Sequence, residues 1–163
     1  MQEHGLKISE LVALFNLEVL NRGSDYDTAL LTITDVNRPG LQFHSFYDYF
    51  DPRRLQVLGK AEITYLKGLT TEQRRKCFDD LFLYDIPALV ISRGLDCFPE
   101  CLESARVHER TLLRTEETTV EFTSHTIEYL NRVLAPCVPR HGVLLDISGE
   151  GVMITGDSGI GKS

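Results

Sequence analysis

The chain has 163 residues, of which 42% are apolar, enough for one ordinary domain with a single hydrophobic core. Seventeen Lys and Arg residues against 24 Asp and Glu residues give a formal net charge of −7 at pH 7. This charge argues against a protein that binds nucleic acid or an anionic membrane surface. No apolar run approaches the roughly 18 residues that a membrane span requires, and no secretory leader is visible, so we expect a cytoplasmic protein.

Four cysteines, Cys77, Cys97, Cys101 and Cys137, are too few for a disulfide scaffold, so we predict free thiols. Cys97 and Cys101 are four residues apart and His108 follows them, which would allow a metal site if this stretch is helical. Structural zinc sites usually bring their ligands in two closely spaced pairs, and the second pair is missing here. The sequence favours buried or half-buried free cysteines over a metal centre.

The beginning of the chain predicts one helix and two strands. The segment ISELVALF, which starts at Ile8, places apolar residues on one helical face, and Ser9 is its predicted N-cap. The residues on that face are Leu11, Leu14 and Phe15. Residues 17–20 and 29–34 are predicted strands, because they alternate or are apolar and β-branched, with turn residues between them.

The sequence NRPG, from Asn37 to Gly40, predicts a turn, because proline lacks an amide donor and glycine tolerates a positive φ. Aromatic residues follow this turn at helical spacing. They are Phe43, Phe46, Tyr47 and Phe50. Core packing explains this aromatic stripe better than a base-stacking platform does, since no basic residue interrupts it before Arg53.

Strands and helices are predicted to alternate from residue 55 to residue 134. The predicted strands are Leu55–Leu58, 88–92 and 111–113, and the segment ALVIS at 88–92 is typical of a buried parallel strand. The predicted helices are the segment TEQRRKCFDDLF from Thr71, Pro99–Val107 and 119–134. The basic residues Arg74, Arg75 and Lys76 predict a solvated face on the first of these helices.

This order of elements predicts an α/β domain of three layers, with a largely parallel sheet and flanking helices, over residues 1–134. Residues 135–140 are the predicted linker, because LAPCVPR carries two prolines in a short stretch. Residues 141–163 are predicted to begin a second domain. It would open with a β-hairpin, formed by strands at 141–148 and 151–155, and continue into a phosphate loop.

The final eight residues match the phosphate-loop pattern G-x-x-x-x-G-K-[ST]. They are Gly156, Asp157, Ser158, Gly159, Ile160, Gly161, Lys162 and Ser163. In such a loop glycines let successive amides point at phosphate oxygens, Lys162 adds a charge at the β- and γ-phosphates, and the Ser163 hydroxyl can ligate Mg²⁺. A glycine-rich turn with an unrelated lysine is the less favoured alternative.

The sequence stops at Ser163, where the helix of a phosphate loop should begin. We therefore expect an amino-terminal domain joined to the first hairpin of a catalytic domain. By itself this piece is expected to be inactive, because the following helix supplies much of the affinity for the phosphate.

The segment PRHGVLLDISGEGVMITGDSGIGKS at 139–163 resembles the start of the catalytic domain of the HPr kinase/phosphorylase family, bacterial enzymes that control sugar uptake. The NRPG turn, the segment LQVLG at 55–59 and the segment LAP at 134–136 also stand where that family has similar residues. The resemblance covers nearly the whole chain, and the combination of these segments is far more specific than a phosphate loop alone.

This resemblance implies an enzyme that phosphorylates a serine of the phosphocarrier protein HPr with ATP or pyrophosphate and reverses the reaction with inorganic phosphate, in carbon catabolite control. It also implies that residues 156–163 bind the nucleotide phosphates, that Ser163 contacts Mg²⁺, and that His141 and Lys162 are active-site residues. Family members assemble as hexamers through their carboxyl-terminal domains. A homo-oligomer is therefore expected for the longer protein.

Several alternatives stay open at this point. Without the resemblance, His141 would be taken for a turn residue, Asp146 for a strand-face residue, and Asp157 for a loop residue turned away from phosphate. The chain could also be the amino-terminal regulatory or binding module of another P-loop kinase or ATPase. The NRPG and HGVLLD segments favour the HPr kinase/phosphorylase reading over that one.

Overall fold

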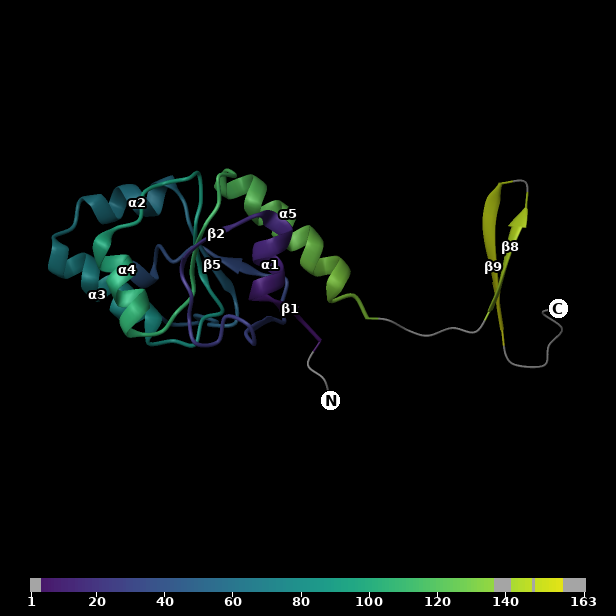
Figure 1. Ribbon diagram of the computed structural model, residues 1–163, viewed down its shortest axis with the longest axis horizontal. Coiled ribbons are helices and arrows are strands. Elements are labelled where there is room, and N and C mark those ends of the chain that lie inside the picture. The colour runs from purple at the N-terminus through teal and green to yellow at the C-terminus, as the bar shows by residue number, and fades with distance from the viewer. Residues whose placement is uncertain (1–3, 137–141, 148, 157–163) are drawn as a thin grey trace.

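A computed structural model describes residues 4–136, 142–147 and 149–156 of the chain. Within residues 4–136, a five-stranded sheet lies between two groups of helices (Figure 1). Its strands are β2 (Glu18–Asn21), β7 (Leu112–Arg114), β6 (Leu89–Ile91), β5 (Leu55–Leu58) and β4 (Val36–Asn37), in that spatial order. The pairings β4–β5, β5–β6 and β6–β7 are parallel, whereas β2 runs antiparallel to β7. The predicted α/β fold with a largely parallel sheet is therefore confirmed.

Strands β5 and β6 form the centre of the sheet and are buried along their whole length. Successive strand residues point to opposite faces, so the side chains of Leu58 and Leu89 enter one apolar core, while Val57 and Val90 enter the other. Because helices cover both faces, these strands are apolar at almost every position.

Three helices cover one face of the sheet, and the apolar core beneath them includes Phe43, Phe78 and Phe82. The helices are α2 (Lys60–Lys67), α3 (Thr71–Phe82) and α4 (Pro99–Val107). Phe78 is fully buried and meets the ring of Phe43 edge-on, with ring centroids 5.7 Å apart. The predicted helices at Pro99–Val107 and from Thr71 are confirmed, and Thr70 caps α3 by accepting a hydrogen bond from the Gln73 amide.

The opposite face is covered by α1 (Ile8–Phe15) and α5 (Thr119–Val133). Phe122 of α5 is fully buried and packs edge-on against Phe15 of α1, with ring centroids 5.8 Å apart. A capping box starts α5, because Thr118 accepts a hydrogen bond from the Glu121 amide and the Glu121 carboxylate accepts one from the Thr118 amide. Helix α5 thus closes the second core.

The strand predicted at 29–34 does not belong to the main sheet. Only β3 (Leu30–Leu31) forms there, and it pairs with β1 (Leu6–Lys7) in a separate two-stranded ladder. The edge position in the main sheet is taken by β4, which includes the first residue of the NRPG turn. A strand of only two residues leaves almost no periodic signal in a sequence, so β4 was not predicted.

The structure corrects two predictions about the first helix, adds a helix that was not predicted, and gives the aromatic stripe little helical structure. Helix α1 begins at Ile8, so Lys7 and not Ser9 is its N-cap, and Leu14 is 47% exposed instead of lying on the buried face. Helix α2 was not predicted at all, because it has eight residues and buries only two apolar side chains, Ile63 and Leu66. The aromatic stripe forms only the 3-10 turn η1 (Gln42–His44) and a series of turns.

Core packing of the aromatic stripe is confirmed for three of its four members. Phe43 is buried in the first core, and Tyr47 and Phe50 pack against that core, whereas Phe46 is 46% exposed. The predicted solvated face of α3 is wrong for Arg74, whose side chain lies between α3 and α4. Lys76 is exposed as expected, and Arg75 is half-buried, with its side chain 41% exposed.

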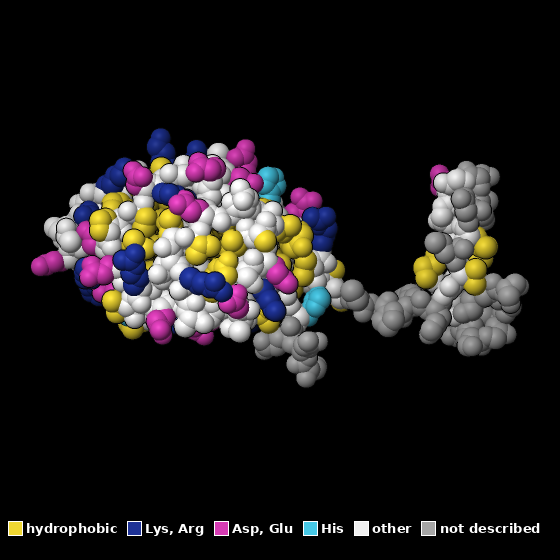
Figure 2. Space-filling view, viewed as in Figure 1, with side chains coloured by type: hydrophobic (Ala, Val, Ile, Leu, Met, Phe, Trp, Pro, Cys, Tyr) yellow, Lys and Arg dark blue, Asp and Glu magenta, His cyan; other side chains and the backbone are white. Residues whose placement is uncertain are grey.

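The remaining described residues form a hairpin of β8 (Gly142–Ile147) and β9 (Glu150–Thr155), and these strands pair only with each other among the described residues. Basic and acidic side chains are mixed over the visible face of the α/β body, with no large area of one sign (Figure 2). Among the described helices, none is long and apolar enough to cross a membrane.

Candidate functional site

The hairpin leads directly into the predicted phosphate loop. Its antiparallel register runs without a break from the pair Ile147–Glu150 at the turn to the pair Gly142–Thr155 at the open end. Gly149 stands in the turn with φ of +84°, a conformation that favours glycine. Strand β9 ends at Thr155, and Gly156, the first residue of the loop pattern, follows it immediately. The predicted hairpin is therefore confirmed over its described residues.

Most of the predicted site residues lie outside the described part of the chain. Gly156 is described, whereas His141 and the rest of the loop are not. The loop residues outside the described ranges are Asp157, Ser158, Gly159, Ile160, Gly161, Lys162 and Ser163. Their roles in phosphate and Mg²⁺ binding stay predictions. Asp146, predicted to be a strand residue, lies in β8 opposite Gly151.

One face of the hairpin is apolar and exposed. Val143 pairs with Ile154, and Leu145 pairs with Val152, so these four residues share a face. Leu145, Val152 and Ile154 are each 40–41% exposed. An apolar strand face of this kind is normally covered by another layer of structure.

The NRPG turn lies at the carboxyl end of β4 and is held by its side chains. The Asn37 amide nitrogen Nδ2 donates to Gln56 Oε1 at 2.6 Å and to Gln42 Oε1 at 3.2 Å, which joins the turn to β5 and η1. The next side chain, Arg38, donates from Nη2 to Glu62 Oε2 at 2.7 Å. Two of the four motif residues therefore fix the position of neighbouring elements.

Glu62, in the first turn of α2, also accepts a hydrogen bond from the Gly59 amide at 2.8 Å. Gly59 ends the LQVLG segment. A Cβ atom placed there would stand 2.6 Å from Thr119 Oγ1 and 2.9 Å from Arg38 Nη2. Two of the sequence segments that carry the resemblance, NRPG and LQVLG, thus meet at Glu62 on the carboxyl edge of the sheet.

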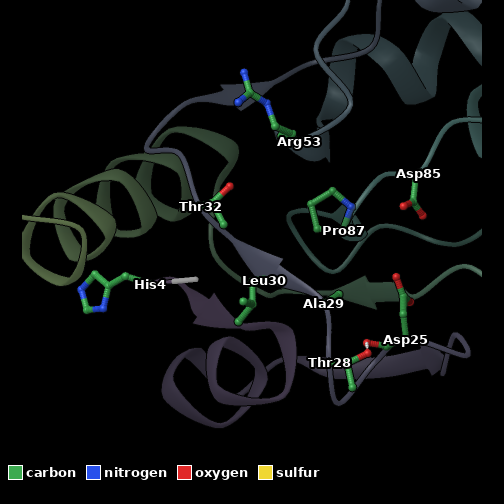
Figure 3. A pocket seen from close by; sticks show the side chains of 9 residues that line it. All are labelled: His4, Asp25, Thr28, Ala29, Leu30, Thr32, Arg53, Asp85 and Pro87. Carbon is green, nitrogen blue, oxygen red and sulfur yellow. Dashed lines mark hydrogen bonds between the residues drawn. The ribbon is translucent and has the colours of Figure 1, made fainter. Parts of the chain in front are cut away.

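A cleft of about 510 Å³ opens at the opposite, amino edge of the sheet (Figure 3). Asp25, Arg53 and Asp85 supply its charged groups. Burial raises the pKa of Asp25, although its own backbone amide and Arg110 act in the other direction. Asp85 is paired with Arg110 at 2.6 Å, and Arg53 is paired with Asp51. The lining residues of this cleft include neither serine nor cysteine.

The amino-edge cleft was not predicted from the sequence. Its lining residues come from the start of the chain, the segment 25–32, Arg53 and the segment before β6. Such residues are brought together only by the fold. They share no motif or spacing that would have revealed them.

The three described cysteines are free thiols; Cys77 and Cys101 are buried and Cys97 is half-buried, as predicted, while Cys137 lies outside the described residues. A hydrogen bond with Cys101 lowers the pKa of Cys97, although burial opposes the effect. His108 is directed elsewhere, with its Nε2 atom 3.2 Å from Asp79 Oδ1. The described residues hold no group of three His, Cys, Asp or Glu placed to bind a metal ion.

Comparison with known protein families decides what kind of chain this is. Residues 6–130 match the family model described as HPr Serine kinase N terminus. The chain belongs to this family. The matched segment contains every strand of the main sheet and both helical layers except the end of α5.

Curated relatives of this HPr serine kinase N-terminus chain extend the match further. The HPr kinase/phosphorylase of Alkaliphilus metalliredigens is 44% identical over 158 residues, which are 97% of this chain and 51% of the relative. The HPr kinase/phosphorylase of Clostridium beijerinckii is 44% identical over 159 residues, with 98% and 52% covered. The chain thus spans about half the length of these relatives. Because 97% of this chain is covered by the match to the Alkaliphilus protein, the matched part includes residues of the hairpin.

A solved structure shows the same fold in another protein. It contains the CBS and DRTGG domains of the regulatory region of a Clostridium perfringens pyrophosphatase, complexed with the activator diadenosine tetraphosphate. The TM-score is 0.54 and the identity 15%, over 78% of this chain and 49% of that chain. At this identity the likeness concerns the fold of this HPr serine kinase N-terminus chain and not its ligands.

Proposed function

We propose that the chain is the amino-terminal part of an HPr kinase/phosphorylase. Such an enzyme uses ATP or pyrophosphate to phosphorylate a serine of HPr and removes the phosphoryl group with inorganic phosphate. The observation that carries this proposal is the 44% identity over 97% of the chain to a curated HPr kinase/phosphorylase. This identity favours the proposal over another P-loop kinase or ATPase.

The phosphate-binding part of the site is proposed to be residues 156–163. Two observations support this role: the residues match the complete loop pattern, and β9 enters the loop directly at Gly156. A strand followed by such a loop is the context in which backbone amides can surround phosphate oxygens. A loop that grips only phosphates can accept pyrophosphate as well as ATP, since it makes no use of the base.

Within that loop, Lys162 is proposed to neutralise the β- and γ-phosphates, and Ser163 to ligate Mg²⁺ through its hydroxyl oxygen. A serine oxygen is a hard donor of the kind that Mg²⁺ prefers, so the residues present fit the ion. When bound, Mg²⁺ would offset negative charge on the phosphates. The residues of this chain would then hold the phosphates in position, which is the main requirement of phosphoryl transfer.

His141 is proposed to be an active-site residue beside this loop. Its sequence neighbour Gly142 pairs across the hairpin with Thr155, the sequence neighbour of Gly156. The open end of the hairpin therefore supports the placement of His141 near the start of the loop. An imidazole there can orient a carboxylate or a phosphate by a hydrogen bond, because its pKa is ordinarily about 6.5.

The organisation of the chain is proposed to be an α/β domain at 1–134, a linker at 135–140 and the beginning of the catalytic domain at 141–163. Both apolar cores are made by residues between Leu6 and Leu134, which supports the first boundary. The exposed apolar face of the hairpin supports a catalytic domain that continues beyond it. The complete protein is proposed to be a hexamer that acts in carbon catabolite control.

The experiment that tests this function uses the protein at the full length of its relatives. Purified HPr is incubated with the enzyme and ATP, or with pyrophosphate, and serine phosphorylation is followed by mass spectrometry. We expect phosphate transfer to HPr, and no transfer to an HPr whose acceptor serine is replaced by alanine. Transfer to some other protein, with none to HPr, would favour a different P-loop kinase.

Lys162→Ala tests the phosphate loop in the same protein. It should abolish transfer and weaken ATP binding, because the charge at the β- and γ-phosphates is lost. Lys67→Ala is the matched control, since Lys67 is an exposed lysine at the end of α2. If Lys162→Ala kept the full rate and affinity, the proposed role of the loop would be wrong.

A further inference from the structure

A second cleft, of about 400 Å³, lies at the carboxyl edge of the sheet between the NRPG turn, η1 and α2. Its walls are formed by Arg38, Leu41, His44, Ala61, Glu62 and Tyr65. None of these residues belongs to the proposed phosphate loop. The volume falls in the range in which proteins bind small molecules, about 300–1,000 Å³.

Arg38 is the cationic group of this carboxyl-edge cleft, and its ion pair with Glu62 occupies only part of its hydrogen-bonding capacity. Arg38 donates to Glu62 through Nη2, which is the one hydrogen bond of its side chain among the described residues, and this side chain stays 48% exposed. Glu62 is 9% exposed and is itself fixed by the Gly59 amide. The guanidinium therefore keeps other N–H groups directed toward solvent, in the planar arrangement that suits a carboxylate or a phosphate.

The opposite side of the cleft is aromatic and apolar. The ring of His44 is stacked on that of Tyr65, with centroids 4.5 Å apart and planes 28° from parallel. His44 Nδ1 donates to the Gly40 carbonyl at 3.0 Å, because a carbonyl can only accept, and this bond fixes the orientation of the ring. Leu41 stands beside this stack and is 63% exposed. An exposed leucine next to an aromatic pair offers an apolar surface that a ligand can cover.

We infer that this cleft binds a small organic anion, in which a carboxylate or phosphate group is attached to a short apolar or aromatic body. The anionic group pairs with Arg38, and the body covers Leu41 and the His44–Tyr65 stack. Both parts of the ligand are needed. Because the protein has a net charge of −7, it does not attract anions in general, so an anion needs a specific partner such as Arg38. An inorganic ion would leave the apolar wall of the cleft uncovered. The inference concerns a ligand of the α/β domain and goes beyond the proposed function of the phosphate loop.

Amide NMR shifts of the 163-residue chain test this inference with four probes: phenyl phosphate, phenylacetate, inorganic phosphate and phenol. Phenyl phosphate and phenylacetate should shift the amides of Leu41, Ala61 and Tyr65, and their relative affinities show whether the site prefers a phosphate or a carboxylate. Inorganic phosphate and phenol should bind at least tenfold more weakly, since each lacks one half of the ligand. Equal binding of inorganic phosphate, or shifts confined to other parts of the chain, would overturn the inference.

Two variants and a control complete the test. Arg38→Gln should weaken the better probe about tenfold, the loss expected for a hydrogen bond to a charged group. Leu41→Ala should weaken it severalfold, and because Leu41 is exposed this variant should fold normally even if Arg38→Gln does not. Arg53→Gln is the matched control, as this exposed arginine lines the other cleft. Unchanged affinity in Leu41→Ala, or an equal loss in Arg53→Gln, would contradict the proposed site.

Discussion

Arg74 and Glu100 form an ion pair between α3 and α4, with Arg74 Nη2 3.0 Å from Glu100 Oε1. The two side chains are only 16% and 7% exposed, so little solvent reaches the pair. Arg74 also donates to the carbonyl of Leu69 at 2.8 Å and lies over the ring of Phe98, 5.0 Å from its centroid. One side chain therefore joins the loop before α3, the helix itself and the start of α4.

Arg74→Met should lower the free energy of unfolding by about 3–5 kcal/mol, because it leaves the carboxylate of Glu100 buried without its partner. Urea unfolding followed by circular dichroism measures this loss. Lys76→Ala is the control: Lys76 lies two residues further along α3 and pairs with Asp80 in an exposed i,i+4 arrangement. It should leave stability nearly unchanged. Equal effects of the two substitutions would show that the buried pair has no special role.

The same pair predicts a dependence on pH. Burial alone would raise the pKa of Glu100, but hydrogen bonds from its own backbone amide and from Arg74 outweigh burial and hold the pKa below its ordinary value of 4.5. A carboxyl whose pKa is lowered by folding stabilises the protein above its unfolded pKa and loses this contribution as the pH falls through the folded pKa. The difference in unfolding free energy between the native chain and Arg74→Met should therefore be largest near pH 7 and shrink below about pH 4.5. A difference that stays constant from pH 7 to pH 3 would contradict this.

The sequence predicts those elements whose local pattern and burial agree. Strands β5 and β6 are short apolar runs because both faces of the sheet are covered, and this is how they were recognised. Helices α3 and α5 are preceded by capping threonines, Thr70 and Thr118, and α4 has Pro99 in its first turn. Here local chemistry and tertiary structure favour the same conformation.

The elements that were missed depend on contacts between distant residues. Strand β4 has two residues, and it exists because Val36 and Asn37 pair with β5 and because Asn37 bonds to Gln56. The burial of Arg74 depends in the same way on Glu100, which is 26 residues away in the sequence. In a sequence window around α3, a basic residue at this position cannot be distinguished from its solvated neighbours.

The candidate sites show the same difference between local sequence patterns and contacts between distant residues. The proposed phosphate loop is a continuous motif, so it could be proposed from the sequence alone, and all of it except Gly156 lies outside the described residues. The NRPG turn was recognised as a turn, but its cleft was not, because Tyr65 and Glu62 reach it from the unpredicted helix α2. A site whose walls come from several elements is specified only by the fold.

Gly59→Ala tests how tightly the carboxyl edge is built. The added Cβ would stand 2.6 Å from Thr119 Oγ1, which is buried and hydrogen-bonded to Ser92, so we expect a loss of about 1–3 kcal/mol in unfolding free energy. Gly40→Ala is the matched control, because a Cβ there meets nothing within 4 Å. It should change stability by less than about 0.5 kcal/mol. Thermal unfolding of both variants decides, and a stable Gly59→Ala protein would show that this edge can relax.

A shortened chain of residues 1–136 should fold by itself. Its two apolar cores include residues from each of the five main strands, and the last described residue that packs against them is Leu134. Calorimetry should therefore give one cooperative transition, with agreement between the calorimetric and van't Hoff enthalpies. A broad transition accompanied by binding of a hydrophobic dye would place the domain boundary further along the chain.

His141→Ala, in the protein at the full length of its relatives, tests the residue that precedes β8. We expect slower kinase and phosphorolysis reactions, because the two directions share one transition state and the imidazole is proposed to orient a group in it. ATP affinity should stay nearly intact, since Lys162 and the loop amides are proposed to supply it. Arg140→Ala, at the neighbouring position, is the control for simple disturbance of the chain there.

Steady-state rates in both directions and a separate measurement of ATP affinity distinguish the possible roles of His141. A loss of rate in both directions at unchanged affinity supports orientation of a reacting group. A large loss of ATP affinity with a normal rate at saturation would make His141 a binding residue instead. If both rates and the affinity were unchanged, His141 would be an ordinary residue at the entrance of a strand, and the pairing of Gly142 with Thr155 would serve only to form the hairpin.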